Sequence, residues 1–155
     1  ASTLDGVEGG QITDPSPPGG ARAAKLALEM ADIEPADLGC IKTHGTGTPV
    51  GDTAELKGIK MWAGEEATRI SITAPKSYSG HLLGAASALE AVLCVRMLET
   101  GMILPTYGLT AETLDPECAE FAHVMDRPKA MIRDFVLANS FGFGGTNGTV
   151  VLGRA

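Results

Sequence analysis

The stretch that decides the fold reads FVLANSFGFGGTNGTVVL and spans residues 135–152. Two apolar runs, 135–140 and 149–152, flank a glycine-rich segment, so we expect two adjacent strands joined by a turn over 141–148. Upstream of this hairpin, helical and strand-like segments alternate. The predicted strands cover 38–43 and 70–74, and the predicted helices cover 21–31, 52–62 and 81–99. This alternation predicts an α/β domain built in layers.

The longest predicted helix, residues 81–99, is apolar around most of its circumference. Its apolar positions are Leu82, Leu83, Ala85, Ala86, Leu89, Val92, Leu93, Val95 and Met97. A helix of this kind is buried on nearly every side. Because a single lobe would leave part of that surface in water, we expect a second layer to cover it.

The ends of the other elements are predicted from capping and chain-breaking residues. Residues 1–20 hold several glycines and prolines and read as a loop-rich entry segment to one domain over 1–155. Asp52 and Thr53 could cap the helix that follows, with Glu55 in its first turn.

The chain starts without Met and without a signal-peptide pattern, so we expect it to be the middle of a protein, or a processed or separately cloned piece.

Composition excludes several classes of function. The net charge of −7 argues against nucleic acid or an anionic membrane as partner. No apolar run approaches the length of a membrane span. The three cysteines have no regular spacing, which predicts neither a disulfide framework nor a zinc site, and the expected location is the reducing cytoplasm.

Three polar loops each follow an apolar strand, and strand ends are where layered α/β folds usually place their chemistry. These loops carry His44 in HGTGT, Lys76 and His81 in KSYSGH, and Phe143 in NSFGFGGTN. Taken alone, each has a plainer explanation: a loop histidine is usually an ordinary hydrogen-bonded residue, a lysine is usually solvated, and a glycine-rich run is usually a turn.

Together the three blocks are specific. HGTGTPVGD (44–52), KSxxGHxxGAA (76–86) and NSFGFGGTN (139–147) occur in this order, and the chain resembles the C-terminal half of the β-ketoacyl synthases, condensing enzymes of the thiolase-like superfamily. Segments 104–106 and 112–115 are more similar to the elongating synthases of type II bacterial pathways than to modular megasynthases. The resemblance implies the C-terminal lobe of the thiolase-like fold, a layered sheet and helices that needs a second lobe over its apolar central helix.

The resemblance also implies roles for single residues. His44 and His81 would be the catalytic pair that promotes decarboxylation of malonyl-carrier protein and holds the thioester oxygen through Nε2–H donors. Lys76 would tune this pair by charge and hydrogen bonding. Thr46 and Thr48 would hydrogen-bond the phosphopantetheine arm, which arrives on the carrier protein, so no resident cofactor is expected.

The glycine-rich turn would gate the site. Phe143 matches the family's gating phenylalanine, and its backbone N–H would complete an oxyanion hole. Gly142 and Gly144, with Gly145, would let the turn swing and approach substrate closely.

Two positions depart from the family pattern. Ser87 replaces a glycine at a place of close helix packing. Lys42 replaces an Asn or Glu which, in some relatives, surrounds a buried cation together with the equivalents of Glu55, Glu90 and Ala138. We expect the Lys42 ammonium to take the cation's place and neutralise Glu55 and Glu90, so no metal ligand is assigned. The alternative is that Lys42 points to solvent.

The nucleophilic cysteine of the family belongs to the N-terminal lobe. Cys40 falls in a strand, Cys94 in an apolar helix and Cys118 in an acidic loop, and none has surroundings that would activate a thiol. We therefore expect a partner, an N-terminal half supplied as a separate or cleaved chain, together with an acyl carrier protein. The chain alone should be inactive, and the reconstituted enzyme should be a dimer.

Other functions remain as alternatives. A non-catalytic subunit resembling the chain-length factors is the first, although such a scaffold has no chemical need for His44, Lys76 and His81. A dinucleotide site at 142–148 is weaker, because that turn joins two strands and precedes no helix. A metal hydrolase fits poorly, since the histidines lack ligand spacing. Acyl chain length stays open, as does the choice among fatty acid, aryl polyene and polyketide pathways.

Overall fold

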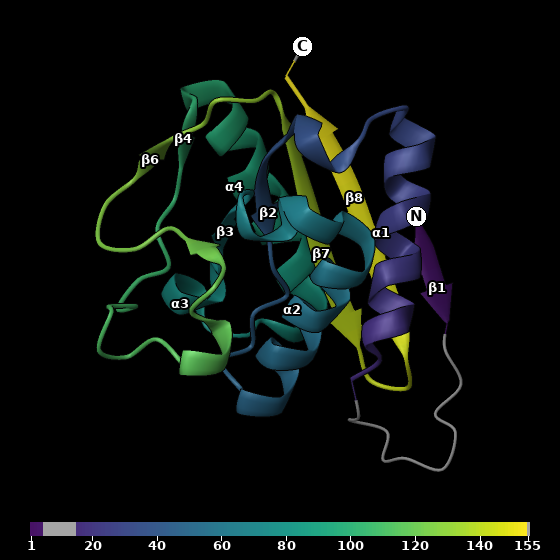
Figure 1. The fold of residues 1–155 in the computed structure, drawn as a ribbon, viewed down its shortest axis with the longest axis horizontal. Coiled ribbons are helices and arrows are strands. Elements are labelled where there is room, and N and C mark those ends of the chain that lie inside the picture. The colour runs from purple at the N-terminus through teal and green to yellow at the C-terminus, as the bar shows by residue number, and fades with distance from the viewer. Residues whose placement is uncertain (5–14, 155) are drawn as a thin grey trace.

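The computed structural model describes residues 1–4 and 15–154, and Figure 1 shows their arrangement around one mixed sheet. Along this sheet the strand order is β1-β8-β7-β2-β3-β5. Its strands are β1 (Ser2–Leu4), β2 (Leu38–Lys42), β3 (Ser71–Thr73), β5 (Ala122–His123), β7 (Phe135–Gly142) and β8 (Thr146–Gly153). A separate two-stranded ribbon pairs β4 (Met102–Ile103) with β6 (Lys129–Ala130). The α-helices are α1 (Pro17–Ala31), α2 (Pro49–Ala63), α3 (Lys76–Ser79) and α4 (Ala86–Thr100).

The direction of the strands brings the three polar loops to one edge of the sheet. β2 pairs in parallel with both β3 and β7, and Ile41 lies in register with Ile72 and Leu137. The carboxyl ends of these three strands therefore meet at the same edge. The predicted α/β layering is confirmed, and so is the terminal hairpin of β7 and β8.

Helices cover both faces of the sheet, in three layers (Figure 1). On one face, α1 and α2 pack on β2, β3 and β7 in an aliphatic core that includes Leu28, Ile59 and Leu137. On the other face, α4 packs its Cys94 and Met97 against Val136. Side chains alternate between the two faces along each strand, so β7 directs Leu137 to one core and Val136 to the other.

One side of α4 has no cover within the described part of the chain. Its buried residues are Ala86, Glu90, Cys94, Met97 and Leu98. Val92 is 58% exposed and Val95 42% exposed on the outer side. Ser87 also lies on the surface rather than at a close helix contact. The helix is thus as apolar as the sequence suggests, but this lobe buries only half of it.

Several predicted boundaries are wrong because local capping decided them differently. α4 begins at Ala86 rather than at residue 81, after the short helix α3 and a 3-10 turn over Leu83–Ala85. α2 begins at Pro49, and its N-cap is Thr48, whose hydroxyl accepts a hydrogen bond from the Gly51 N–H. Proline fits the first turn of a helix, where no N–H is required. Glu55 therefore lies in the second turn of α2.

The predicted loop-rich entry segment is wrong at both of its described ends. Ser2–Leu4 form the edge strand β1, which pairs with β8. α1 starts at Pro17, where the Ser16 hydroxyl accepts from the Gly19 N–H. Residues 5–14 of this segment lie outside the described residues. The hairpin turn is also shorter than predicted. β7 and β8 are longer than expected, so only residues 143–145 remain between them.

Within residues 1–4 and 15–154, no helix combines the length and apolarity that a bilayer crossing requires.

Candidate active site

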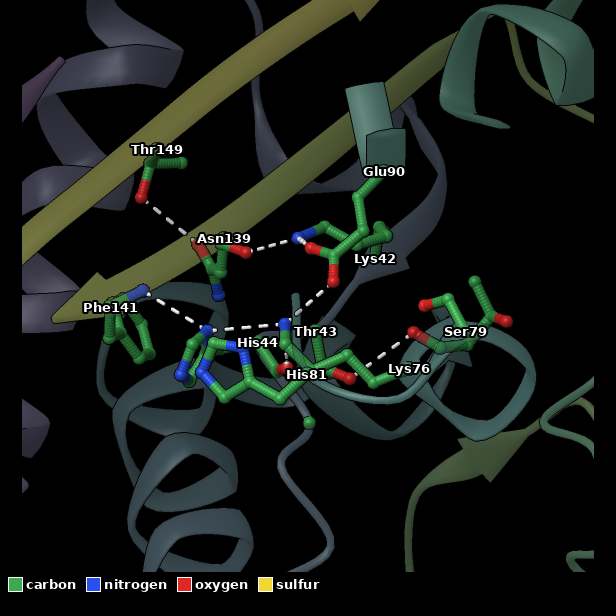
Figure 2. Close-up of polar contacts among 12 residues, drawn as sticks. Lys42, Thr43, His44, Lys76, Ser79, His81, Glu90, Asn139, Phe141 and Thr149 are labelled. Atoms are coloured by element: carbon green, nitrogen blue, oxygen red, sulfur yellow. Dashed lines mark hydrogen bonds and ion pairs between the residues drawn. The ribbon is translucent and has the colours of Figure 1, made fainter. Parts of the chain in front are cut away.

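The segments after β2 and β3 bring two histidines and a lysine together beside the end of β7, as Figure 2 shows. The rings of His44 and His81 lie edge to face, with their centroids 5.4 Å apart and an interplanar angle of 82°. Lys76 lies beside His44, with its Nζ 3.4 Å from Nδ1 of that ring. The predicted convergence of His44, Lys76 and His81 is therefore present in the structure.

The ring of His44 is oriented by a donor from β7. The backbone N–H of Phe141 points at Nδ1 of His44 at 3.3 Å. Because Nδ1 accepts this hydrogen bond, we assign the ring proton of the neutral form to Nε2. Burial, together with the charges of Lys76 and Lys42 and against an opposing effect of Glu90, lowers the pKa of His44 to about 4. His44 is thus a neutral imidazole near pH 7.

His81 is held in the same way. The backbone N–H of Leu83 donates to Nδ1 of His81 at 3.1 Å, so its proton is also assigned to Nε2. Leu83 has a φ of +51°, an unusual conformation for a leucine. In both histidines a backbone donor occupies Nδ1, which leaves the Nε2–H group free to donate elsewhere.

Lys76 is buried rather than solvated. Its Nζ donates to the carbonyl of His44 at 2.6 Å and forms an ion pair with Glu90 Oε1 at 2.6 Å. Burial lowers the pKa of Lys76, while the hydrogen bond and charge of Glu90 oppose that shift. Lys76 therefore links His44, two residues after the end of β2, to helix α4.

Glu55 holds the loop that carries His44. Its Oε1 accepts the His44 N–H at 2.9 Å, and its Oε2 accepts the Gly45 N–H at 3.0 Å. Asn139 Nδ2 also donates to Oε1, at 3.0 Å. Burial raises the pKa of Glu55, and these hydrogen bonds offset part of the rise. Gly45 needs its small size here, because it has a φ of +47° and a Cβ would lie 2.7 Å from Thr43 Oγ1.

Lys42 does not point to solvent, since only 1% of it is exposed. Its Nζ pairs with Glu90 Oε2 at 2.5 Å and donates to the carbonyl of Asn139. Burial raises the pKa of Glu90, but the hydrogen bonds from Lys42 and Lys76 outweigh burial and keep that pKa below its ordinary value. Glu55, the other predicted partner, is held instead by backbone donors and Asn139.

Thr46 and Thr48 lie at the start of α2. Their hydroxyl oxygens are 3.0 Å apart, and that of Thr48 also caps the helix. An open cavity of about 740 Å³ is lined by both threonines together with His44, His81 and Phe143. A second cavity, of about 460 Å³, shares both threonines and His81 and extends to Lys76. Both predicted threonines thus face spaces that also reach the histidines.

Phe143 lies in the hairpin turn and is 73% exposed. Gly142 ends β7, while Gly144 and Gly145 follow with φ of +76° and +79°. The phenylalanine that approaches the histidines is Phe141, whose ring centroid is 5.6 Å from that of His44.

Sequence reasoning gave no role to Phe141 or Asn139. Asn139 receives a hydrogen bond from the Thr149 hydroxyl at 3.0 Å, which orients its side-chain amide toward Glu55. Both residues belong to the NSFGFGGTN block. That block was the available signal, but only its glycine-rich turn was interpreted, and the strand residues before the turn were not.

All three cysteines are free and buried. Burial raises the pKa of Cys40 and Cys118, and it raises the pKa of Cys94 to about 11. A thiol of this kind is a poor nucleophile near pH 7. The described residues hold no group of three or more His, Cys, Asp or Glu side chains that could bind a metal ion.

Comparisons with known proteins identify the family to which the fold belongs. The family described as "Beta-ketoacyl synthase, C-terminal domain" matches residues 1–110. The chain is 40% identical over 142 residues to 3-oxoacyl-acyl-carrier-protein synthase 2 of Staphylococcus aureus, covering 90% of this chain and 34% of that relative. It therefore spans about a third of the length of that relative.

Solved structures show the same likeness. The ishigamide ketosynthase/chain length factor matches with a TM-score of 0.89 and 34% identity, over 99% of this chain and 36% of the other. A type II polyketide ketosynthase in complex with its acyl-carrier protein matches with a TM-score of 0.90 and 30% identity, over 100% of this chain and 37% of the other. The fold is that of the C-terminal part of these ketosynthases.

Proposed function

The chain belongs to the β-ketoacyl synthase family, as its C-terminal domain, and on that premise we propose that it supplies the His44, His81 and Lys76 machinery for condensing an acyl thioester with malonyl-acyl carrier protein. One observation carries the proposal. Both histidines have a backbone N–H on Nδ1, from Phe141 and Leu83, so both have an Nε2–H donor for a substrate oxygen. Two fixed Nε2–H donors suit the stabilisation of an oxyanion.

In the proposed reaction the malonyl C–C bond breaks and CO₂ leaves. The electron pair moves into the thioester, and negative charge develops on its oxygen. The two Nε2–H groups stabilise that oxyanion, because fixed donors are strongest where water is excluded. The carbanion then attacks the carbonyl carbon of the acyl thioester. The thiolate of the nucleophilic cysteine, which had carried the acyl chain, leaves. A neutral His44 suits this role, since burial lowers its pKa to about 4.

Other residues would support these steps. Lys76 fixes the loop of His44 and disfavours the imidazolium form by its charge. Phe143 is proposed to gate the cavity, its N–H completing the oxyanion hole for the acyl carbonyl, with Gly142 and Gly144 giving the turn its freedom. Thr46 and Thr48 are proposed to hydrogen-bond the phosphopantetheine arm, which arrives on the carrier protein. No resident cofactor is proposed.

The nucleophilic thiol is proposed to come from outside these 155 residues, in an N-terminal ketosynthase half, because all three cysteines here are buried with raised pKa values. That half is also proposed to cover the open side of α4 and to provide the contacts of a dimeric enzyme. The chain alone would not condense substrates. We place the reaction in the cytoplasm, which suits three free thiols.

A second candidate is a non-catalytic subunit that resembles a chain-length factor. One similar structure is a ketosynthase/chain length factor, so this fold occurs in both classes of protein. The fixed tautomers of His44 and His81 favour the catalytic proposal.

The test uses the complete enzyme that contains this lobe, with malonyl- and acyl-carrier protein. We expect His44→Ala and His81→Ala each to lower the condensation rate by about 100-fold or more, the size of a lost oxyanion donor. Arg69→Ala, at a surface ion pair with Glu66 in the segment that follows α2, is the control. A complete, folded enzyme that lacks all condensation would support the second candidate instead.

A further inference from the structure

We propose that Lys42 is a positioning residue of this site, which holds Glu90 and the carbonyl of Asn139 so that Lys76 and Phe141 both reach His44. The inference rests on the proposed function for its consequence in catalysis, and on the structure alone for its geometry. The ammonium group of Lys42 contacts Glu90 and the carbonyl of Asn139 rather than either histidine, so it would act through other residues.

Glu90 is shared between two ammonium groups. Lys42 occupies its Oε2 at 2.5 Å, and Lys76 occupies its Oε1 at 2.6 Å. The side chains of Lys42 and Glu90 are each 1% exposed, and that of Lys76 is 5% exposed. Water therefore cannot replace a lost partner easily, and each ammonium group fixes the carboxylate for the other.

The first connection to His44 runs through α4. With Oε2 held by Lys42, Glu90 presents Oε1 to Lys76, as Figure 2 shows. Lys76 in turn contacts the His44 carbonyl at 2.6 Å and approaches Nδ1 at 3.4 Å. If Lys42 were lost, a carboxylate with one free oxygen would rotate toward Lys76 and draw its Nζ away from the ring.

The second connection runs through β7. Lys42 donates to the carbonyl of Asn139, two residues before the N–H that orients His44. The side chain of Asn139 is fixed independently by Glu55 and Thr149. Lys42 thus joins α4, whose Glu90 holds Lys76, to the end of β7, whose Phe141 N–H reaches Nδ1 of His44.

The charges agree with this arrangement. Around His44 the groups that face it are Lys42, Lys76, Glu90 and His81, and Glu55 lies beneath the loop. Two ammonium groups and two carboxylates balance one another, so the buried cluster is neutral without a charge on His44. The charge of Lys42 also helps to keep the pKa of His44 low.

The test compares Lys42→Met, which keeps an unbranched side chain of nearly the same length without the ammonium group, with the wild-type enzyme that contains this lobe. Lys25→Met, at an exposed position of α1, is the matched control. We expect Lys42→Met to lower kcat for malonyl-carrier protein decarboxylation by about 30-fold while KM changes by less than about threefold, since small displacements of catalytic groups have effects of this order. An unchanged kcat, or a rise in KM of the same size, would overturn the inference.

A double variant covers the case in which Lys42→Met fails to fold. Lys42→Met with Glu90→Gln removes the stranded carboxylate together with its partner. If Lys42 acts through Glu90, the double variant should be no more than about threefold slower than Glu90→Gln alone. Effects that multiply would show that Lys42 acts independently and would overturn the inference.

A readout that needs no turnover separates this inference from the proposed function. The ¹⁵N signals of the His44 ring report the donors at Nδ1. We expect them to shift in Lys42→Met and to stay fixed in Lys25→Met. If the wild-type enzyme decarboxylates nothing, the proposed function fails and these signals still decide the role of Lys42. Unchanged signals in a folded Lys42→Met protein would reject it.

Discussion

The backbone N–H of Phe141 lies 3.3 Å from Nδ1 of His44, although 97 positions separate the two residues in the chain. β2 brings the histidine to the edge of the sheet, and its parallel neighbour β7 brings the donor. The contact fixes both the rotation of the ring and the nitrogen that carries its proton. The predictions below concern the groups that hold this arrangement.

We expect His44 to titrate near pH 4, well below the ordinary histidine value, because burial and the ammonium groups of Lys76 and Lys42 disfavour the imidazolium form. Its folded-state pKa is lower than its unfolded one, so its contribution to stability is present above pH about 6.5 and is lost as the pH falls toward 4. NMR titration of ¹³C-labelled histidine measures the pKa. Urea unfolding measures stability. Between pH about 6.5 and 4, the free energy of unfolding of the wild type should fall by about 2 kcal/mol more than that of His44→Gln, after allowance for partial exposure.

Glu55→Gln should lower the free energy of unfolding by about 2 kcal/mol, because an amide cannot accept from the N–H groups of His44 and Gly45 and also from Asn139. The matched control is Glu120→Gln, which breaks the surface pair with Lys60, where the two side chains are 48% and 47% exposed. Such pairs contribute well under about 1 kcal/mol. Equal losses in the two variants would contradict the buried role of Glu55.

Thr48→Ala should lower stability by about 1 kcal/mol, the usual cost of a lost N-cap hydroxyl, whereas Thr48→Ser should retain most of it. Thr53→Ala tests the cap that the sequence suggested. The Thr53 hydroxyl donates back to the carbonyls of Pro49 and Val50 and caps no N–H group, so its removal should be nearly neutral. Thermal unfolding ranks the stabilities of the three variants. If Thr53→Ala lost more stability than Thr48→Ala, the helix would start later than Pro49.

The cysteines of the folded chain should react slowly with iodoacetamide. With a pKa of about 11, Cys94 has about 100-fold less thiolate at pH 8 than an ordinary thiol, and burial limits access further. Mass spectrometry follows the alkylation, and urea should restore ordinary rates at all three positions. Rapid alkylation of Cys40, Cys94 or Cys118 in the folded state would reopen the question of the nucleophile.

Val92→Lys should leave the stability of the lobe itself within about 0.5 kcal/mol, because Val92 is 58% exposed. It should nevertheless prevent association with a second lobe, since a charge would be buried at that contact. Met30→Lys makes the same chemical change at a position 79% exposed on α1 and should have no such effect. Size-exclusion chromatography of the complete enzyme distinguishes the two variants.

Much of the fold was predictable because its signals are local. The alternation of apolar strands and helices gave the layers, and three contiguous blocks placed His44, Lys76 and His81 after strand ends. Those blocks also carried the family resemblance, which the comparisons confirm. Helix starts were less predictable, because prolines at 17 and 49 begin helices in this chain rather than breaking them.

The sequence by itself determined the α/β class, the family and the residue types available for chemistry, since these depend on periodicity and on short contiguous motifs. Only the tertiary structure decided that Lys42 is buried, that it shares Glu90 with Lys76, and that Phe141 rather than a side chain orients His44. These contacts join residues 48, 14 and 97 positions apart. Sheet register and helix packing set such distances, and no local pattern encodes them.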